Sequence, residues 1–166
     1  MRKALTAMTA MTATIGLVLA PGICAGAAAA AKPAHDKSFS TIAVGAMISS
    51  SGNRFEKVYR IIRSPDGGGG AVQDGTLGGT VFPVAGHDTM ELFFRDGLQM
   101  TADTFTLGPP GIDGIGAVTG AGRCTTGTGM HQGEKCSYKI TGTYDLDTSV
   151  TRLRLTGTFT RAASAT

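Results

Sequence analysis

The chain contains no tryptophan, and aromatic residues make up only 6% of its 166 residues. Charged residues are also scarce, at 16%, against about 25% in an average soluble domain. This scarcity excludes a coiled coil and a charge-rich disordered tail. The formal net charge is only +3, far from the basic excess of a nucleic-acid-binding protein. We therefore expect no nucleic-acid partner.

Amphipathic helices are missing as well. After residue 32, no window repeats apolar residues at the three-and-four spacing of a helix over three turns. Short runs of Thr, Val, Ile and Phe are instead interrupted by Gly, Asp and Pro, which is typical of many short strands. Glycine is abundant, at 25 residues, but lacks the every-third-residue period of collagen. The sequence predicts an all-β protein.

The N-terminus has the three regions of a secretory signal peptide. Met1–Lys3 is basic, Ala4–Ala20 carries no charge, and Ala-x-Ala cleavage sites follow between Ala25 and Ala31. We expect cleavage between Ala27 and Lys32 and a secreted, extracellular product. The predicted domains are a signal peptide (1–31), a flexible arm (32–37) and a single β-barrel domain (38–166).

A membrane anchor and a lipoprotein are the alternatives for this segment. Ala4–Ala20 is rich in Thr and Ala and shorter than the roughly 20 strongly apolar residues of a membrane span. Ile23, which precedes Cys24, is not the small residue that normally precedes a lipidated cysteine. We therefore expect no membrane partner after cleavage. Because Arg2 and Lys3 are removed, the mature chain is close to neutral and needs no polyanion partner.

Cleavage also decides the cysteine count. It removes Cys24 and leaves Cys124 and Cys136, and a remaining pair in an exported chain predicts a disulfide. The alternatives are two free thiols or a metal pair. A metal pair fits poorly, because the spacing is wide and His131 is the only nearby histidine. We expect no metal and no other cofactor.

The turn residues divide the chain into about eight strands. No helix is available to cover this sheet, and closure removes its edges, so we predict an eight-stranded antiparallel up-and-down barrel. A two-sheet β-sandwich is the alternative. Such a barrel is just wide enough for side chains or one small ligand. The predicted strands span 38–49, 54–63, 71–84, 89–95, 98–107, 112–119, 136–146 and 150–160, with a turn at Gly86–Asp88.

The strongest hairpin signal lies in Thr89–Leu107. Asp96-Gly97 predicts a two-residue turn in which Arg95 pairs with Leu98. Apolar side chains fall on both faces of this hairpin, so its outer face is predicted to contact another subunit or a loop of the same chain. From the first alternative we expect a homo-oligomer, a trimer or a dimer.

A Gly-rich stretch carries a resemblance to a known superfamily. Gly116–Gly129, with the sequence GAVTGAGRCTTGTG, resembles the T-G-G-T-G-[RK]-[YF]-x-G-A-x-G signature of the allene oxide cyclase and dirigent-type barrels. Gly142–Leu146 is similar to the final hairpin of that superfamily, and an upstream strand that ends in Gly75–Thr80 is compatible with the resemblance. The stretch departs from the signature at Ala121, where Gly-Thr is usual, and at Cys124, where an aromatic residue is usual.

The resemblance covers roughly Phe39–Arg161 and implies an eight-stranded barrel, often trimeric, that guides cyclisation or radical coupling of hydrophobic small molecules. No residue matches the catalytic residues of the plant cyclases, so none is carried over. The motif glycines are predicted to allow a tight bend. The stretch is not a phosphate-binding loop, because no Lys-Ser/Thr and no helix follow it.

Candidate site residues are polar side chains on predicted strands near a barrel interior. Carboxylates beside an arginine are suited to polarising a ligand, and tyrosines are suited to lining a cavity. Surface charges and core tyrosines with bonded hydroxyl groups are the commoner explanations. The ligand-binding candidates are Glu91, Arg95, Asp103, Tyr138 and Tyr144.

Two histidine–carboxylate pairs have the residue types of acid–base catalysts near neutral pH. These are His87-Asp88 and His131 with Glu134, and all four residues lie in predicted turns, where solvated side chains are more common. The chain has no G-x-S-x-G and no His-Glu-x-x-His motif, so hydrolytic chemistry is not predicted.

Two functions remain open from the sequence. The first is a secreted barrel that binds a hydrophobic small molecule, with cyclase-like ring closure of the isomerase or lyase type as a further step. The second is a non-catalytic extracellular interaction or inhibitor module. An open apolar pocket with a few polar groups would favour the first, whereas an interior filled by Phe, Leu and Ile would favour the second.

Overall fold

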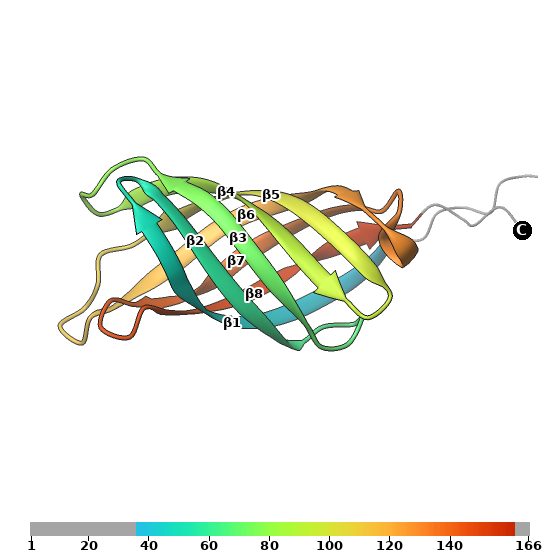
Figure 1. Cartoon of the computed structure of the whole chain (residues 1–166), viewed down its shortest axis with the longest axis horizontal. Coiled ribbons are helices and arrows are strands. Elements are labelled where there is room, and N and C mark those ends of the chain that lie inside the picture. The colour runs from blue at the N-terminus through green and yellow to red at the C-terminus, as the bar shows by residue number, and fades with distance from the viewer. Residues whose placement is uncertain (1–35, 162–166) are drawn as a thin grey trace, which may run out of the picture. The chain divides into compact units, whose positions relative to one another are not determined.

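The strands of this protein close into an eight-stranded antiparallel barrel (Figure 1). The structure is a computed structural model that describes residues 36–161. The predicted signal peptide, its cleavage site and residues 32–35 of the arm lie outside the described residues. Within residues 36–161, no helix has the length and apolar character needed to cross a membrane.

Each strand pairs with the next one along the chain, and β8 pairs with β1 to close the sheet. This confirms the up-and-down barrel and rules out the sandwich. The elements are β1 (Asp36–Ser51), β2 (Arg54–Arg63), β3 (Gly69–Leu77), β4 (Val84–Phe94), β5 (Gly97–Leu107), β6 (Ile115–Gly127), a 3-10 turn η1 (Gly129–His131), β7 (Lys135–Asp145) and β8 (Val150–Thr160).

The predicted bounds of β2 and β8 match the structure, whereas three other predictions need correction. Strand β1 begins at Asp36, so the last two residues of the predicted arm pair with β8. The strand predicted over 71–84 ends at Leu77, because the loop Gly78–Pro83 follows. Gly86–Asp88 is not a turn but part of β4, where it pairs with both β3 and β5.

The hairpin of β4 and β5 forms with a different register from the predicted one. Arg95 and Asp96 form the turn, and Phe94 lies opposite Gly97, so the predicted pairing of Arg95 with Leu98 is wrong. The shift is an even number of residues, so each side chain stays on its predicted face. Leu92 points inward and Phe93 outward, as the alternation requires.

Glycines inside the barrel make room for aromatic rings on the neighbouring strands. A Cβ atom on Gly75 would lie 2.4 Å from the Phe55 ring, and one on Gly122 would lie 2.5 Å from the Tyr138 ring. The resembling Gly-rich stretch is therefore mostly strand β6 and not a tight bend. Its glycines act through close packing, because of its members only Gly129 has a positive φ.

Substitution of Gly122 by alanine should lower stability because the new methyl group would collide with the Tyr138 ring and with Asp103 Oδ1, 2.1 Å away. We expect Gly122→Ala to lower the free energy of unfolding by about 1–3 kcal/mol, the cost typical of overpacking. Chemical denaturation measures this change. Gly79→Ala is the matched control, since a Cβ there meets nothing within 4 Å. Equal stabilities of the two variants would contradict the packing role of Gly122.

Candidate functional site

A chain of hydrogen-bonded polar side chains crosses the interior of the barrel. The Tyr59 hydroxyl donates to Gln73 Oε1 at 2.7 Å, and Gln73 Nε2 donates to Asp88 Oδ2 at 2.7 Å. On the other side, the Tyr138 hydroxyl donates to Asp103 Oδ1 at 2.6 Å. Strand pairing places Asp88 directly opposite Asp103. The two halves of the chain therefore meet at a pair of carboxyl groups.

Burial sets the protonation of this carboxyl pair. Asp88 is 6% exposed and Asp103 is 3% exposed. Burial and the facing charge of Asp103 raise the pKa of Asp88 to about 8. Burial raises the pKa of Asp103 to about 6, although a hydrogen bond from Tyr138 acts in the opposite direction. Asp88 Oδ1 and Asp103 Oδ2 have no hydrogen-bond partner in the structure, and the two raised pKa values mean that the pair holds one proton at neutral pH.

An amine lies in the same interior. Lys57 alternates with the buried Phe55 and Tyr59 along β2, and its Nζ donates to Thr151 Oγ1 at 2.9 Å. Burial lowers the pKa of Lys57, and the nearby carboxyl of Asp88 partly offsets this effect. The interior thus combines an amine, a carboxyl pair and two tyrosines, which are the residue types of acid–base chemistry.

The interior leaves almost no free space beside these groups. A cavity that Lys57, Gln73 and Asp88 help to line measures ≈ 20 Å³, and a second one beside Tyr138 also measures ≈ 20 Å³. A volume of this size holds about one water molecule. Small-molecule sites usually measure about 300–1,000 Å³. Acid–base groups are present, but the two cavities inside the barrel have no room for a substrate beside them.

The five predicted ligand-binding residues do not form a single site in the structure. Asp103 and Tyr138 meet inside the barrel, as described above. The hydroxyl of Tyr144 donates to the backbone oxygen of Gly108 at 2.6 Å, near one end of the barrel. Glu91 lies on the outer face of β4, and Arg95 lies in the β4–β5 turn.

Sequence reasoning missed part of the interior chain. Lys57, Tyr59 and Gln73 were not among the candidates, and Asp88 was expected to be solvated in a turn. Alternation along the strands carries the missing signal, because Asp88 is two residues before the buried Met90. Polar residues at such inward positions are easily assigned to the outer face, since burial of a charge is unfavourable unless it is neutralised or paired.

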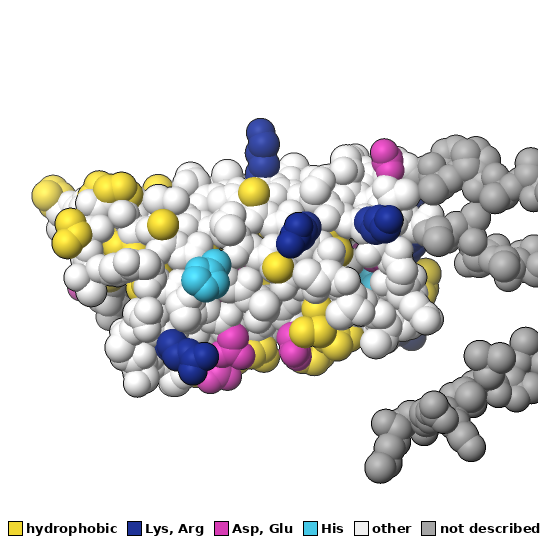
Figure 2. Space-filling model, turned by 90° about the horizontal axis from the view of Figure 1, so that it is seen from above, with side chains coloured by type: hydrophobic (Ala, Val, Ile, Leu, Met, Phe, Trp, Pro, Cys, Tyr) yellow, Lys and Arg dark blue, Asp and Glu magenta, His cyan; other side chains and the backbone are white. Residues whose placement is uncertain are grey.

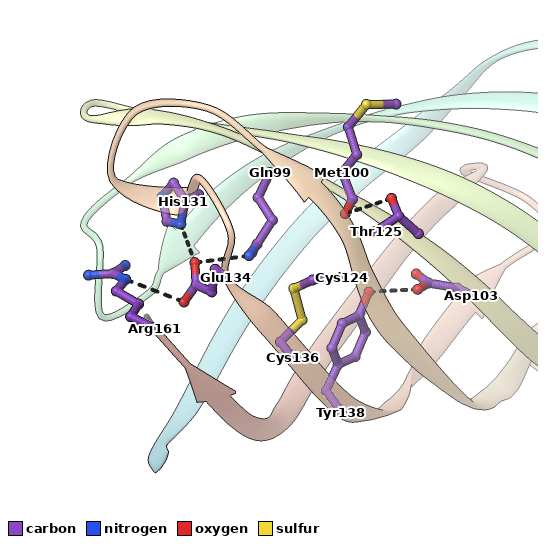
Figure 3. The surroundings of a disulfide bond; sticks show 10 residues. All are labelled: Gln99, Met100, Asp103, Cys124, Thr125, His131, Glu134, Cys136, Tyr138 and Arg161. Atoms are coloured by element: carbon purple, nitrogen blue, oxygen red, sulfur yellow. Dashed lines mark hydrogen bonds and ion pairs between the residues drawn. A yellow bond between two sulfur atoms is a disulfide. The ribbon is translucent and has the colours of Figure 1, made fainter. Parts of the chain in front are cut away.

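A second cluster of polar side chains closes the barrel end at which β1 begins and β8 finishes (Figure 3). His131 Nδ1 donates to Glu134 Oε2 at 2.6 Å, and Gln99 Nε2 donates to the same oxygen at 3.0 Å. Arg161 lies 3.5 Å from the other Glu134 oxygen and forms an ion pair with Asp66. His131 and Glu134 are 1% and 7% exposed, so the expectation that they are solvated is wrong.

The predicted disulfide is confirmed and lies next to this cluster (Figure 3). Cys124 on β6 bonds to Cys136 on β7, with the two Cα atoms 4.9 Å apart. The bond joins the two ends of the segment that carries His131 and Glu134. A disulfide is typical of a protein that folds in an oxidising environment.

The outer surface of β1–β6 carries two neighbouring features. The first, the outer hollow, is an open depression of ≈ 1050 Å³ with small, mostly hydroxyl-bearing side chains on its floor. The larger polar residues of its lining are Arg54, Glu56, Asp74, His87 and Arg123. The carboxyl pair, Asp88 and Asp103, also borders the hollow, although these residues are only 6% and 3% exposed. The second, the outer patch, consists of outward apolar side chains on adjacent strands, namely Val58, Val72, Phe93, Leu98 and Met100.

The comparisons with known proteins give no relative. No protein-family model matches the chain, and no curated protein matches it either. The resemblance to the allene oxide cyclase and dirigent-type barrels therefore stays a prediction. Among residues 36–161, no group of three or more His, Cys, Asp or Glu side chains is arranged to hold a metal ion.

The carboxyl pair makes stability depend on pH. A carboxyl whose pKa is raised by folding stabilises the native state most at low pH, and this contribution is lost as the pH rises through the folded pKa values of about 6 and 8. We expect the free energy of unfolding to fall from about pH 4, near the ordinary carboxyl pKa, to about pH 8, the folded pKa of Asp88. Asp88→Asn mimics the protonated acid and should be more stable than the wild type at pH 8 by about 1–3 kcal/mol.

Denaturant titrations of both proteins at several pH values measure this effect. Asp74→Asn is the control, because Asp74 is an exposed carboxyl on β3 and should leave the pH profile unchanged. Parallel pH profiles for the wild type and Asp88→Asn would contradict the shared proton.

Loss of the disulfide should destabilise the chain without removing the barrel. The bond spans 12 residues, for which chain entropy gives about 3 kcal/mol. We expect Cys124→Ser/Cys136→Ser to unfold at a lower denaturant concentration and to retain its β-sheet circular dichroism. Reductant should lower the stability of the wild type only. If reductant leaves the wild type unchanged, the disulfide makes no contribution.

Proposed function

We propose that the chain is a secreted, non-catalytic interaction module that binds a protein partner through the outer patch and the adjoining hollow. The observation that carries this proposal is the contrast between a filled interior and an exposed apolar outer face. The secreted location rests on the signal-peptide pattern of the N-terminus and on the disulfide.

The filled interior argues against a hydrophobic ligand. Large side chains such as Phe105, Ile140 and Leu155 occupy inward positions and are nearly inaccessible to solvent. The remaining cavities of ≈ 20 Å³ accommodate water rather than a small molecule. The interior acid–base groups thus have no internal space in which to meet a substrate. Asp88 and Asp103 border the outer hollow but expose only 6% and 3% of their surface to solvent. Ring closure inside the barrel, which the resemblance implies, gains no support from this geometry.

The outer face has the anatomy of a protein interface. Val58 is 39% exposed and Phe93 is 44% exposed, and together with their neighbours they form a mainly apolar area on the barrel wall. The carboxyl group of Glu91 lies within this area, between Val72 and Met100. The outer hollow next to it supplies hydroxyl groups and the charged side chains of Arg54 and Arg123. Interfaces commonly combine an apolar centre, rich in Phe and Met, with a polar rim. A second copy of this chain is one such partner, as the predicted homo-oligomer requires.

Site-specific photo-crosslinking tests this proposal. A photoreactive amino acid at position 93 should give a covalent adduct in the native secretion medium, and Met100→Asp should abolish it. The same amino acid at position 154, an exposed site on β8, is the control and should give none. The mass of the adduct shows whether the partner is a second copy. No adduct at position 93, or equal adducts at both positions, would contradict the proposal.

Native mass spectrometry tests the competing function. The purified wild-type protein should carry no bound small molecule, because the interior has no volume for one. A hydrophobic compound that copurifies in a one-to-one ratio would instead support ligand binding in the barrel.

A further inference from the structure

The loops at one end of the barrel expose large aliphatic side chains. Ile112 is fully exposed, and Val81, Leu146 and Ile115 are 83%, 55% and 42% exposed. They belong to the β3–β4 loop, the β5–β6 loop with the start of β6, and the β7–β8 turn, which all lie at the end away from Asp36 and Arg161 (Figure 1). Figure 2 shows hydrophobic atoms gathered at this end. We call Val81, Ile112, Ile115 and Leu146 the apolar crown.

The longest loop of the crown is held in shape by its own hydrogen bonds. Tyr144 donates its hydroxyl proton to the Gly108 oxygen, and the Leu146 amide donates to the Gly114 oxygen, so β7 and its turn brace the loop. Most amides from 108 to 115 are either bonded or absent, because the loop contains two prolines. The bonds run from Gly108 to Ala117 O, from Gly111 to Ile115 O, from Gly114 to Gly111 O and from Ile115 to Asp113 Oδ1.

The backbone hydrogen bonds of this loop affect how readily it can enter an apolar environment. A loop that enters an apolar phase must carry few unpaired amides, because each one is costly to remove from water. A β-turn displays Ile112 at its tip, and the Gly114-to-Gly111 bond closes that turn. No hydrogen bond is formed by the amides of Ile112 and Asp113, which lie at the tip, so the tip suits the polar headgroup boundary while the backbone behind it stays bonded.

The charges of the crown loops indicate which kind of lipid surface the crown can bind. Within residues 78–83, 108–114 and 146–149, the charged residues are Asp113 and Asp147, and both are exposed. The β1–β2 turn at the same end carries no charge itself but is followed by the exposed Arg54. Next to them, backbone hydrogen bonds from the Thr148 and Asp147 amides lower the pKa of Asp145, which keeps this carboxyl ionised. An anionic lipid surface repels such a tip. A zwitterionic headgroup instead presents its cationic ammonium group outermost, where the aspartates can meet it.

We propose that the apolar crown docks the barrel end-on onto a zwitterionic lipid surface. The four aliphatic side chains enter the boundary between headgroups and acyl chains, while Asp113 and Asp147 face the ammonium groups. This revises the expectation that the mature chain has no membrane partner. The outer patch lies on the barrel wall and stays free in this orientation, so the proposal does not depend on the protein partner.

Vesicle co-sedimentation tests the proposal with the wild-type protein and phosphatidylcholine vesicles. The wild type should sediment with these vesicles, and Ile112→Ser/Leu146→Ser should lower its apparent affinity by roughly fivefold or more, because it removes two of the four apolar groups. Phe93→Ser is the matched control, since it removes an exposed apolar side chain of the outer patch. Vesicles that contain phosphatidylglycerol should bind the wild type less tightly.

The absence of tryptophan allows a direct readout of orientation. An Ile112→Trp variant should show a blue shift of its fluorescence with phosphatidylcholine vesicles, whereas an Ile62→Trp variant, with its reporter exposed on β2, should not. The proposal is overturned if the wild type does not bind these vesicles, if the double serine variant binds equally well, or if Phe93→Ser abolishes binding. A crown that binds only a protein would give the first of these results.

Discussion

Closure of β8 onto β1 fixes the volume that all inward side chains must share. An eight-stranded barrel is just wide enough for side chains to fill it, so a large residue on one strand requires a small one on the next. Tyr138 opposite Gly122 and Phe105 opposite Gly120 show this complementarity. The high glycine content follows from this constraint, because the rings that fill the centre leave no space for side chains beside them.

The same constraint explains why the polar groups inside the barrel meet at one carboxyl pair. Asp88 and Asp103 face each other across a strand pair, and the interior cavity beside Asp88 has room for about one water molecule. Two ionised carboxylates at this separation would repel each other, so a shared proton lowers the cost of burial. Tyr138 and Gln73 then satisfy the outer oxygens. Such a network restricts the interior to one arrangement of side chains, which suits a rigid module more than a variable ligand pocket.

A feature can be predicted from the sequence when a single stretch of residues or the composition indicates it, and not when it depends on contacts between distant strands. The barrel could be predicted from strand alternation and the absence of predicted helices, and the disulfide from the cysteine count. The structure confirms both predictions. The predicted register of β4 and β5 is wrong. Asp96-Gly97 has the composition of a two-residue turn, but in the structure Arg95 and Asp96 form the turn. The interior polar chain depends on contacts between Tyr59, Gln73 and Asp88 on three strands, which no single stretch of sequence contains.

The packing role of the β6 glycines and the grouping of the crown residues could not be predicted from the sequence for the same reason. Each becomes meaningful only when neighbouring strands are placed beside it, as Tyr138 is beside Gly122. Similarly, Val81 and Leu146 are isolated apolar residues in their loops until barrel closure brings the loops to one end. Exposed aliphatic residues are ordinary when scattered but informative when gathered.

The two barrel ends differ in a way that supports separate roles. At one end, the disulfide, the buried His131–Glu134 pair and Arg161 join the β6–β7 segment to the end of β8. At the other end, three loops have aliphatic side chains at their tips, and the charged residues within these three loops are acidic. An end fixed by covalent and ionic contacts resists opening, so it gives no route into an interior that is already filled. Binding is therefore left to the surfaces that project outward, on the barrel wall and at the crown.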